Sequence, residues 1–324
     1  MTTDPDLILD RRRMRRKVTV WRLVSFIAIA VALIAFFGAI AVSSGTDLKK
    51  NSSHIARVPI SGFISNSRYA MKRLKKIRDD KNVKAVIIAV DSPGGTTVGG
   101  EALYRAFRDI AKKKPIVTSI GSLAASAGYM VAVASDHIVA PRTSIVGSVG
   151  VIMQYPDATK LLDNIGITME EIKSSPLKAE PSPFNATPPE ARVMLESMLL
   201  DTYTWFANLV RERRGFKENQ AKGLLNGSVF TGKQALDNKL IDAIGDEDTA
   251  KEWLISEKKI SKNLEVINWS LSKPQQEYIF ARAALNGLLS NLGLSTLFDL
   301  GEQHFASQHK TNLDGFLSVW QVKQ

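Results

Sequence analysis

A single serine, Ser126, lies among small residues in LAASAGYMVAVASD (123–136), where an apolar helix is expected to begin. Two roles are open for it. Serine is a favoured helix cap, since its hydroxyl accepts a hydrogen bond from a first-turn N–H group. The same position also suits a nucleophile, because backbone N–H groups there can hold the oxyanion of an acyl-transfer reaction. The groups that could act with Ser126 decide between these roles.

A serine nucleophile needs a base. The four histidines are His54, His137, His304 and His309. If a helix joins Ser126 to His137, eleven residues at about 1.5 Å each place them roughly 16 Å apart, which argues against a triad. A lysine can serve when an apolar environment lowers its pKa. Lys178 lies in the proline-bounded stretch EEIKSSPLKAEPSPF (170–184), outside the charged helix faces. An ordinary surface lysine is the other interpretation.

An oxyanion also needs two N–H donors. The amide of Ala127, next to the serine, is one candidate. The stretch DSPGGTTVGG (91–100) offers Gly94 and Gly95 at the end of an expected strand. Glycines let a substrate carbonyl approach the backbone closely. The alternatives are an ordinary strand-to-helix turn and a phosphate loop, but the phosphate-loop pattern GxxxxGK[ST] is absent.

Strands and helices alternate around these motifs, which indicates an α/β fold with a mostly parallel sheet. The run VKAVIIAVDS (83–92) is typical of a strand buried on both faces. Further strands are expected at 56–65, 115–121, 136–141, 143–154 and near 167–173, and helices at 67–82, 99–114 and 188–214. A turn, a short helix and a last strand are expected over 227–245.

The N-terminus predicts a membrane anchor. The apolar run at 23–42 follows the basic cluster RRRMRRK (11–17), and about 20 residues are enough to cross a bilayer. Because positive charge stays on the cytoplasmic side, the remaining chain is expected outside the cytoplasm. A cleaved signal peptide, with AIA (39–41) as its cleavage site, is the alternative.

The composition of the chain narrows the possible functions and binding partners. The 324 residues carry a formal net charge of +11, without a basic patch interleaved with aromatic residues, so nucleic-acid binding has little support. With no cysteine, the chain has no disulfide and no thiolate metal site. No cofactor is expected. The apolar stretch 277–298 reads as a packing or oligomer helix, and a helix lying on the membrane is the alternative.

DSPGG, GSLAASAGYMVA, GSVGV and LKAEPSPF, in this order behind an N-terminal anchor, resemble the signal peptide peptidase A family in its short, single-repeat bacterial form. The resemblance covers about residues 56–250 and implies the Clp protease/crotonase-like fold, built from repeated ββα/βαβ units. It also implies a serine peptidase with a Ser/Lys dyad. Its substrates would be signal-peptide remnants or misfolded exported proteins.

By this resemblance Ser126 is the nucleophile and Lys178 the general base, with Lys173 rejected because it falls inside the expected strand at 167–173. Ser148 of GSVGV would orient the lysine. The oxyanion donors would be Ala127 with Gly94 or Gly95, of which Gly95 is favoured. Alanine at 127 departs from the glycine that is usual after the nucleophile.

The chain is therefore expected to comprise a cytoplasmic N-terminus (1–22), a transmembrane helix (23–43), a linker (44–56), a peptidase domain (57–250) that the resemblance covers, and a helical extension (251–324). The protein would sit in the bacterial inner membrane with its peptidase domain outside the cytoplasm. Longer relatives pair two repeats, so this single-repeat chain is expected to form a homo-oligomer of four or eight subunits. Each serine would face a neighbour's lysine. The alternatives are a crotonase-like acyl-transfer enzyme and a non-catalytic membrane scaffold.

Overall fold

The computed structural model describes residues 17–27, 50–217, 220–221, 223–272 and 317–319. The chain divides into two units, Met1–Ser53 and His54–Gln324. In the first unit, 17–27 is helical and exposed. No helix within the described ranges is long and apolar enough to cross a bilayer. Most of the expected span at 23–42 lies outside those ranges.

The second unit is built on one sheet, whose main path runs β6-β5-β3-β2-β1-β8. β4 pairs with β3 and β7, and β9 pairs with β2. The strands are β1 (His54–Ile64), β2 (Val83–Thr96), β3 (Ile116–Ala125), β4 (His137–Ala140), β5 (Ile145–Gly147), β6 (Val229–Thr231), β7 (Ala243–Ile244), β8 (Glu265–Asn268) and β9 (Leu317–Val319). All pairs are parallel except β5–β6 and β2–β9. The predicted α/β class with a largely parallel sheet is therefore confirmed.

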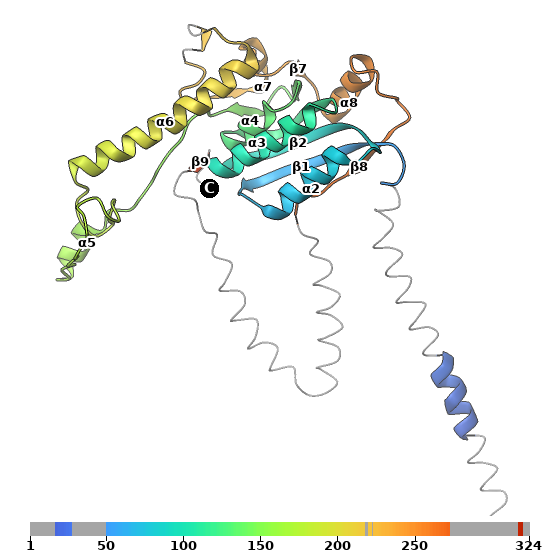
Figure 1. Ribbon diagram of the computed structural model, residues 1–324, viewed down its shortest axis with the longest axis horizontal. Helices are drawn as coiled ribbons and strands as arrows, with labels where there is room; N and C mark the ends of the chain where they lie inside the picture. The colour runs from blue at the N-terminus through green and yellow to red at the C-terminus, as the bar shows by residue number, and fades with distance from the viewer. Residues whose placement is uncertain (1–16, 28–49, 218–219, 222, 273–316, 320–324) are drawn as a thin grey trace, which may run out of the picture. The chain divides into compact units, whose positions relative to one another are not determined.

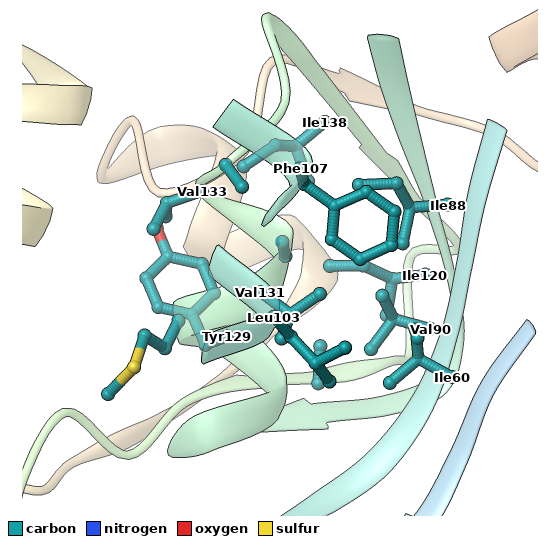
Figure 2. Close-up of a cluster of buried hydrophobic side chains, with 14 of the residues drawn as sticks. Ile60, Ile88, Val90, Leu103, Phe107, Ile120, Tyr129, Val131, Val133 and Ile138 are labelled. Atoms are coloured by element: carbon teal, nitrogen blue, oxygen red, sulfur yellow. The ribbon is translucent and has the colours of Figure 1, made fainter. Parts of the chain in front are cut away.

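Helices cover both faces of the central strands. One face packs against α2 (Arg68–Asp79), α3 (Thr97–Ala111) and α4 (Ala127–Ala132). Figure 2 shows Phe107 of α3 and Tyr129 of α4 in this core, with Ile88 and Ile120 from the strands. The other face carries Ile87 and its neighbours under α8 (Glu247–Ser256). Burial on two faces explains the continuous apolar run of β2.

Side-chain caps fix where the covering helices begin. The Ser67 hydroxyl accepts a hydrogen bond from the N–H of Ala70 at the start of α2. Thr96 Oγ1 accepts from the N–H of Gly99 at 3.0 Å and caps α3. Thr96 is also the last residue of β2, so the chain passes from strand to helix without a loop. This fixes the end of β2 against the start of α3.

Five expectations differ from the structure or lie outside its described part. β2 continues to Thr96, so the diglycine extends a strand instead of forming a turn. The expected strand at 143–154 shortens to β5, and the one near 167–173 is irregular. α8 extends past residue 250, and β8 lies beyond it and pairs with β1 in the same sheet, so the expected helical extension from 251 includes a strand. The apolar stretch 277–298 lies outside the described residues.

Residues 151–200, called the arm below, include α5 (Thr159–Asn164) and the first half of α6 (Pro189–Arg214). In Figure 1, α5 and this end of α6 lie away from the sheet. The second half of α6 buries Phe206 and Val210 in the core. Large apolar side chains stay exposed along the arm: Ile152, Tyr155, Leu161, Ile165, Ile167, Met169, Ile172, Leu177, Phe184, Val193, Met198 and Leu200.

Candidate active site

Ser126 occupies a sharp turn between β3 and α4. Its backbone has φ 55° and ψ −119°, and only 1% of the residue is exposed. A positive φ is uncommon outside glycine and costs about 1–3 kcal/mol when the surroundings enforce it. The Ser126 side chain makes no capping hydrogen bond with α4. The helix-cap role weighed above is therefore not the one this serine plays.

The end of β5 holds Ser126 in this conformation. The Ser126 N–H donates to the carbonyl of Gly147 at 2.8 Å, and its hydroxyl is 3.5 Å from the carbonyl of Gly150. Ser148 follows Gly147, is buried and also has a positive φ, 52°. The Ser148 N–H donates to the carbonyl of Ser228 at 2.7 Å. The structure thus brings the GSVGV motif to Ser126.

The diglycine segment lies on the other side of Ser126, because β2 and β3 are neighbours and Ser92 pairs with Ala124. The two glycines differ in their surroundings. The Gly94 N–H donates to the hydroxyl of Ser92 at 3.1 Å. A Cβ on Gly95 would lie 1.9 Å from the carbonyl oxygen of Ile64, so only glycine fits there. The Gly94 amide already has a partner, which favours Gly95 as the oxyanion donor.

Ser92 is a site residue that the sequence analysis missed. Its buried hydroxyl donates to the carbonyl of Gly62 at 2.7 Å while accepting from Gly94. It therefore ties the end of β1 to the diglycine segment. The Ser92 carbonyl would lie 2.7 Å from a Cβ on Gly128, so α4 also approaches β2 closely. The sequence did contain a signal for Ser92, because it is the serine of DSPGG. The sequence analysis considered only the glycines of that motif.

The first turns of α3 and α4 meet beside the serine. A Cβ on Gly100 would lie 3.0 Å from the Cβ of Ala127. Ala127 is fully buried, so its methyl group belongs to the packing between the helices. This contact explains how the site accommodates alanine where glycine is usual.

Lys178 lies apart from this buried group. It sits on the arm, in the irregular segment between α5 and α6, and its side chain is exposed. The backbone N–H of Lys178 donates to the carbonyl of Ser175 at 3.1 Å. The structure therefore brings together Ser126, Ser148, Ala127 and the diglycine. It leaves Lys178 on the surface of the single chain.

Lys173, the other lysine of this segment, is held in ion pairs. Its ammonium contacts the carboxylates of Glu171 and Glu180, the latter at 2.7 Å. These hydrogen bonds raise the pKa of Lys173 above its ordinary value. A lysine with a raised pKa is a poor base at neutral pH. Lys173 is therefore a poor candidate for the general base. The reason is its ion pairs, and not the strand that was expected at 167–173.

The comparisons with known proteins cover this site. The model of peptidase family S49 matches residues 108–261, a range that contains Ser126, Ser148 and Lys178. A Synechocystis protein provisionally named as a protease is 34% identical over 61% of this chain and 72% of its own length. A protein of Enterococcus faecium provisionally named signal peptide peptidase SppA is 34% identical over 60% of this chain and 57% of its own.

A further relative is a chloroplast protein of Arabidopsis thaliana named serine protease SPPA. It is 30% identical over 70% of this chain, which spans 33% of that protein's length. The Synechocystis match covers more than two thirds of that relative, and the family model matches the region around Ser126. The chain is therefore a member of peptidase family S49, the signal peptide peptidase A family of peptidases.

Proposed function

We propose that the protein is a membrane-anchored serine peptidase in which Ser126 is the nucleophile and Lys178 the general base. The strained conformation of Ser126 at the β3–α4 turn carries this proposal. Sharp strand-to-helix turns present nucleophilic serines in other hydrolases. Backbone strain that the surroundings enforce is concentrated at functional sites. A serine with only a packing role gains nothing from this conformation.

The reaction follows from the groups at this turn. Neutral Lys178 takes the proton of the Ser126 hydroxyl as its oxygen attacks the peptide carbonyl. A tetrahedral oxyanion forms, and the lysine then gives the proton to the leaving amine, which departs from the acyl-enzyme. The same lysine next activates a water molecule, which releases the acid and restores the serine. In acylation the lysine passes the serine proton to the leaving amine. In deacylation it passes the water proton to the serine oxygen, so the lysine is neutral again after each half of the cycle.

Backbone amides would stabilise the oxyanion. We assign the donors to the N–H groups of Gly95 and Ala127, which lie on either side of Ser126. The N–H of Gly94 is engaged by Ser92 at 3.1 Å, which supports the choice of Gly95. Donors fixed in advance need no reorganisation during the reaction, and losing one typically slows such enzymes by about 10²–10³-fold.

The base would come from a neighbouring subunit. A lysine acts as a base only where burial lowers its pKa, and Lys178 is exposed in the single chain. The arm that carries it also exposes many apolar side chains, including Ile172 and Leu177. A second copy could cover both, with Lys178 meeting Ser126 and Ser148 of that copy. The subunit number, four or eight, remains the expectation given by the resemblance.

The anchor and the substrate class rest on the sequence. The apolar run at 23–42 behind RRRMRRK would hold the peptidase domain at the outer face of the cytoplasmic membrane. Peptides left in or near that membrane, such as signal-peptide remnants, would then be the substrates. Unfolded exported proteins are the close alternative.

Covalent labelling tests the proposal. A fluorophosphonate probe should modify the detergent-solubilised full chain, and mass spectrometry should place the adduct on Ser126. The Ser126→Ala variant should be unlabelled and should keep its melting temperature within a few degrees, because only one hydroxyl is removed. Labelling at another serine would contradict the assignment of Ser126. Absence of labelling in a correctly assembled protein would favour the scaffold or the crotonase-like alternative.

A further inference from the structure

The helix that follows Ser126, α4, is held at its other end by an arginine of α6. Arg213 donates from Nε to the carbonyl of Val133 at 2.9 Å and from Nη2 to the carbonyl of Ser135 at 2.8 Å. Carbonyls at the C-terminal end of a helix have no partner within the helix. The positive charge of the guanidinium also suits the negative end of the helix dipole. Arg213 thus binds α4 at the end opposite to Ser126.

Two further groups complete this contact. Arg108 of α3 donates to the carbonyl of Ala134 at 2.8 Å. Asp136 lies 3.3 Å from the guanidinium of Arg108 and 3.8 Å from that of Arg213. A carboxylate that pairs with both arginines offsets their mutual repulsion, so both can approach the same helix end. Only 22% of the Arg213 side chain is exposed, so the contact is largely shielded from solvent.

The position of α4 matters because Ser126 has a strained backbone. A residue with a positive φ keeps that conformation only where its surroundings enforce it. On the strand side, the Ser126 N–H donates to the carbonyl of Gly147. On the helix side, the Ser126 carbonyl accepts the first hydrogen bond of α4, from the N–H of Met130 at 2.9 Å. Because α4 has only six residues and is about 9 Å long, a shift at its far end reaches the serine.

α6 connects this contact to the arm. Figure 1 shows α6 as one helix that leads from the arm toward α4. Arg213 lies in its last turn. The next residue, Arg214, contacts a different region, since it donates to the Lys239 carbonyl at 2.8 Å and pairs with Asp242 at 2.7 Å. The helix that begins on the arm therefore ends, through Arg213, on the helix that follows Ser126.

We propose that Arg213 is a positioning residue for the reaction at Ser126, because it holds α4, and with it the serine, at a fixed place relative to α6. The inference rests on the proposed function, since it takes Ser126 as the nucleophile. Arg213 binds the far end of α4 and does not act on the substrate. A displacement of about 1 Å can slow an enzyme about 10²-fold. Loss of this contact should therefore slow the attack without weakening substrate binding.

Glutamine at position 213 tests the proposal on the detergent-solubilised full chain, with the adjacent arginine as the matched control. Arg213→Gln should lower kcat, and the rate at which a fluorophosphonate labels Ser126, by about 10- to 100-fold, with KM within about twofold of wild type. Arg214→Gln also loses hydrogen bonds to a carbonyl and an ion pair with an aspartate. It should lower the melting temperature by a similar amount but leave the labelling rate within about twofold of wild type.

A milder variant covers the case in which Arg213→Gln does not fold. Arg213→Lys keeps the positive charge, but an ammonium group lacks the planar fork that reaches two carbonyls at once. The labelling rate should fall by about three- to tenfold, between wild type and the glutamine variant. This graded loss is expected from a geometric role, because the lysine retains part of the contact.

Two results would overturn the inference. Labelling at the wild-type rate in both variants at position 213 would show that Ser126 is positioned without this contact. Equal losses of labelling in Arg213→Gln and Arg214→Gln would show that both substitutions act through general stability. In either case, labelling of the wild-type protein at Ser126 would leave the proposed peptidase intact.

Hydrogen exchange keeps the inference testable if the wild-type protein is not labelled, a result that would contradict the proposed function. The amides of residues 127–136 should exchange about tenfold faster in Arg213→Gln than in wild type, because local opening is easier once the end of α4 is released. Arg214→Gln should leave their exchange unchanged. Wild-type exchange of these amides in Arg213→Gln would contradict the hold on α4, whatever the outcome for catalysis.

Discussion

The junction of β2, β3 and β5 around Ser126 differs from the arm that carries Lys178. At the junction, Ser126, Ser92 and Ser148 are all buried, and hydrogen bonds and glycine contacts from four different strands define their positions. On the arm, Lys178 is exposed and Ile172 is fully solvated. The chain completes the first region by itself and leaves the second open.

This difference suggests which half of the site depends on assembly. Monomeric proteins rarely expose large contiguous apolar surfaces, and the arm exposes twelve large apolar residues. The nucleophile and the oxyanion donors would therefore be formed in each subunit as it folds. The base would be completed only when another copy covers the arm. The predictions below test this division between the junction and the arm.

The largest expected effect comes from the two lysines of the arm. Lys178→Arg should lower kcat/KM by about 10³-fold or more, because arginine stays protonated and cannot accept the serine proton. Lys173→Arg, its matched control, should keep activity near wild type, since arginine can still pair with Glu171 and Glu180. Hydrolysis of an unfolded substrate measures both. An active Lys178→Arg variant would point to another base.

The next effect is recovery of activity between subunits. Ser126→Ala and Lys178→Ala should each be inactive alone. If the serine of one copy meets the lysine of another, co-expression of the two variants should restore about a quarter of wild-type activity, the statistical share of intact pairs in randomly mixed oligomers. Native mass spectrometry must show mixed oligomers. No recovery in confirmed mixtures would place the dyad within one subunit and remove the proposed contrast between junction and arm.

Much of the junction could be read from local sequence. The continuous apolar run of β2 predicts a strand buried on both faces, and the helices between strands predict a parallel sheet. The serine among small residues marks a tight strand-to-helix turn. These features depend on near neighbours along the chain, which is why the order of β1, α2, β2, α3, β3 and α4 is confirmed.

The remaining features of the fold and the site depend on contacts between residues that are far apart in sequence. The engagement of the Gly94 amide follows from Ser92, whose hydroxyl is fixed by Gly62, thirty residues earlier. β9 pairs with residues more than 200 positions before it. The segment 167–173 is apolar enough for a strand but is irregular in the structure. Strand propensity is expressed only where a neighbouring strand accepts the pairing.

A smaller effect tests how tightly the junction is built. Gly95→Ala would place a methyl group 1.9 Å from the Ile64 carbonyl, so the backbone must shift. We expect a loss of about 1–3 kcal/mol in the free energy of unfolding, together with loss of hydrolysis. The control Gly121→Ala meets Asp91 at 3.4 Å, an ordinary contact, and should change stability by less than about 1 kcal/mol. Urea denaturation measures the stability of both variants. Equal stability of Gly95→Ala and Gly121→Ala would show that the backbone of the junction can shift at little cost.

The smallest expected effect is a pH dependence of stability that belongs to the sheet and not to the arm. His137 of β4 stacks on Trp253 at 4.7 Å between ring centroids. Burial lowers its pKa, and Arg214 lowers it further, while Asp242 and Glu257 oppose the shift. In the unfolded chain the pKa of the histidine is about 6.5. Just below that pH the unfolded state therefore binds more protons than the folded state.

The stabilising contribution of neutral His137 is therefore complete above about pH 6.5 and declines as the pH falls from there toward the folded pKa. In urea denaturation, wild type should lose up to about 1.4 kcal/mol per pH unit within that window relative to His137→Phe, which keeps the ring stacked on Trp253 but cannot titrate. Glu171 on the arm has a lowered pKa, mainly because Lys173 donates a hydrogen bond to it. Its contribution is present at pH 5–7 and is lost only in more acidic solution, so Glu171→Gln should leave the slope of that window unchanged. A slope that responds to Glu171→Gln but not to His137→Phe would mean that the arm, and not the sheet, limits stability there.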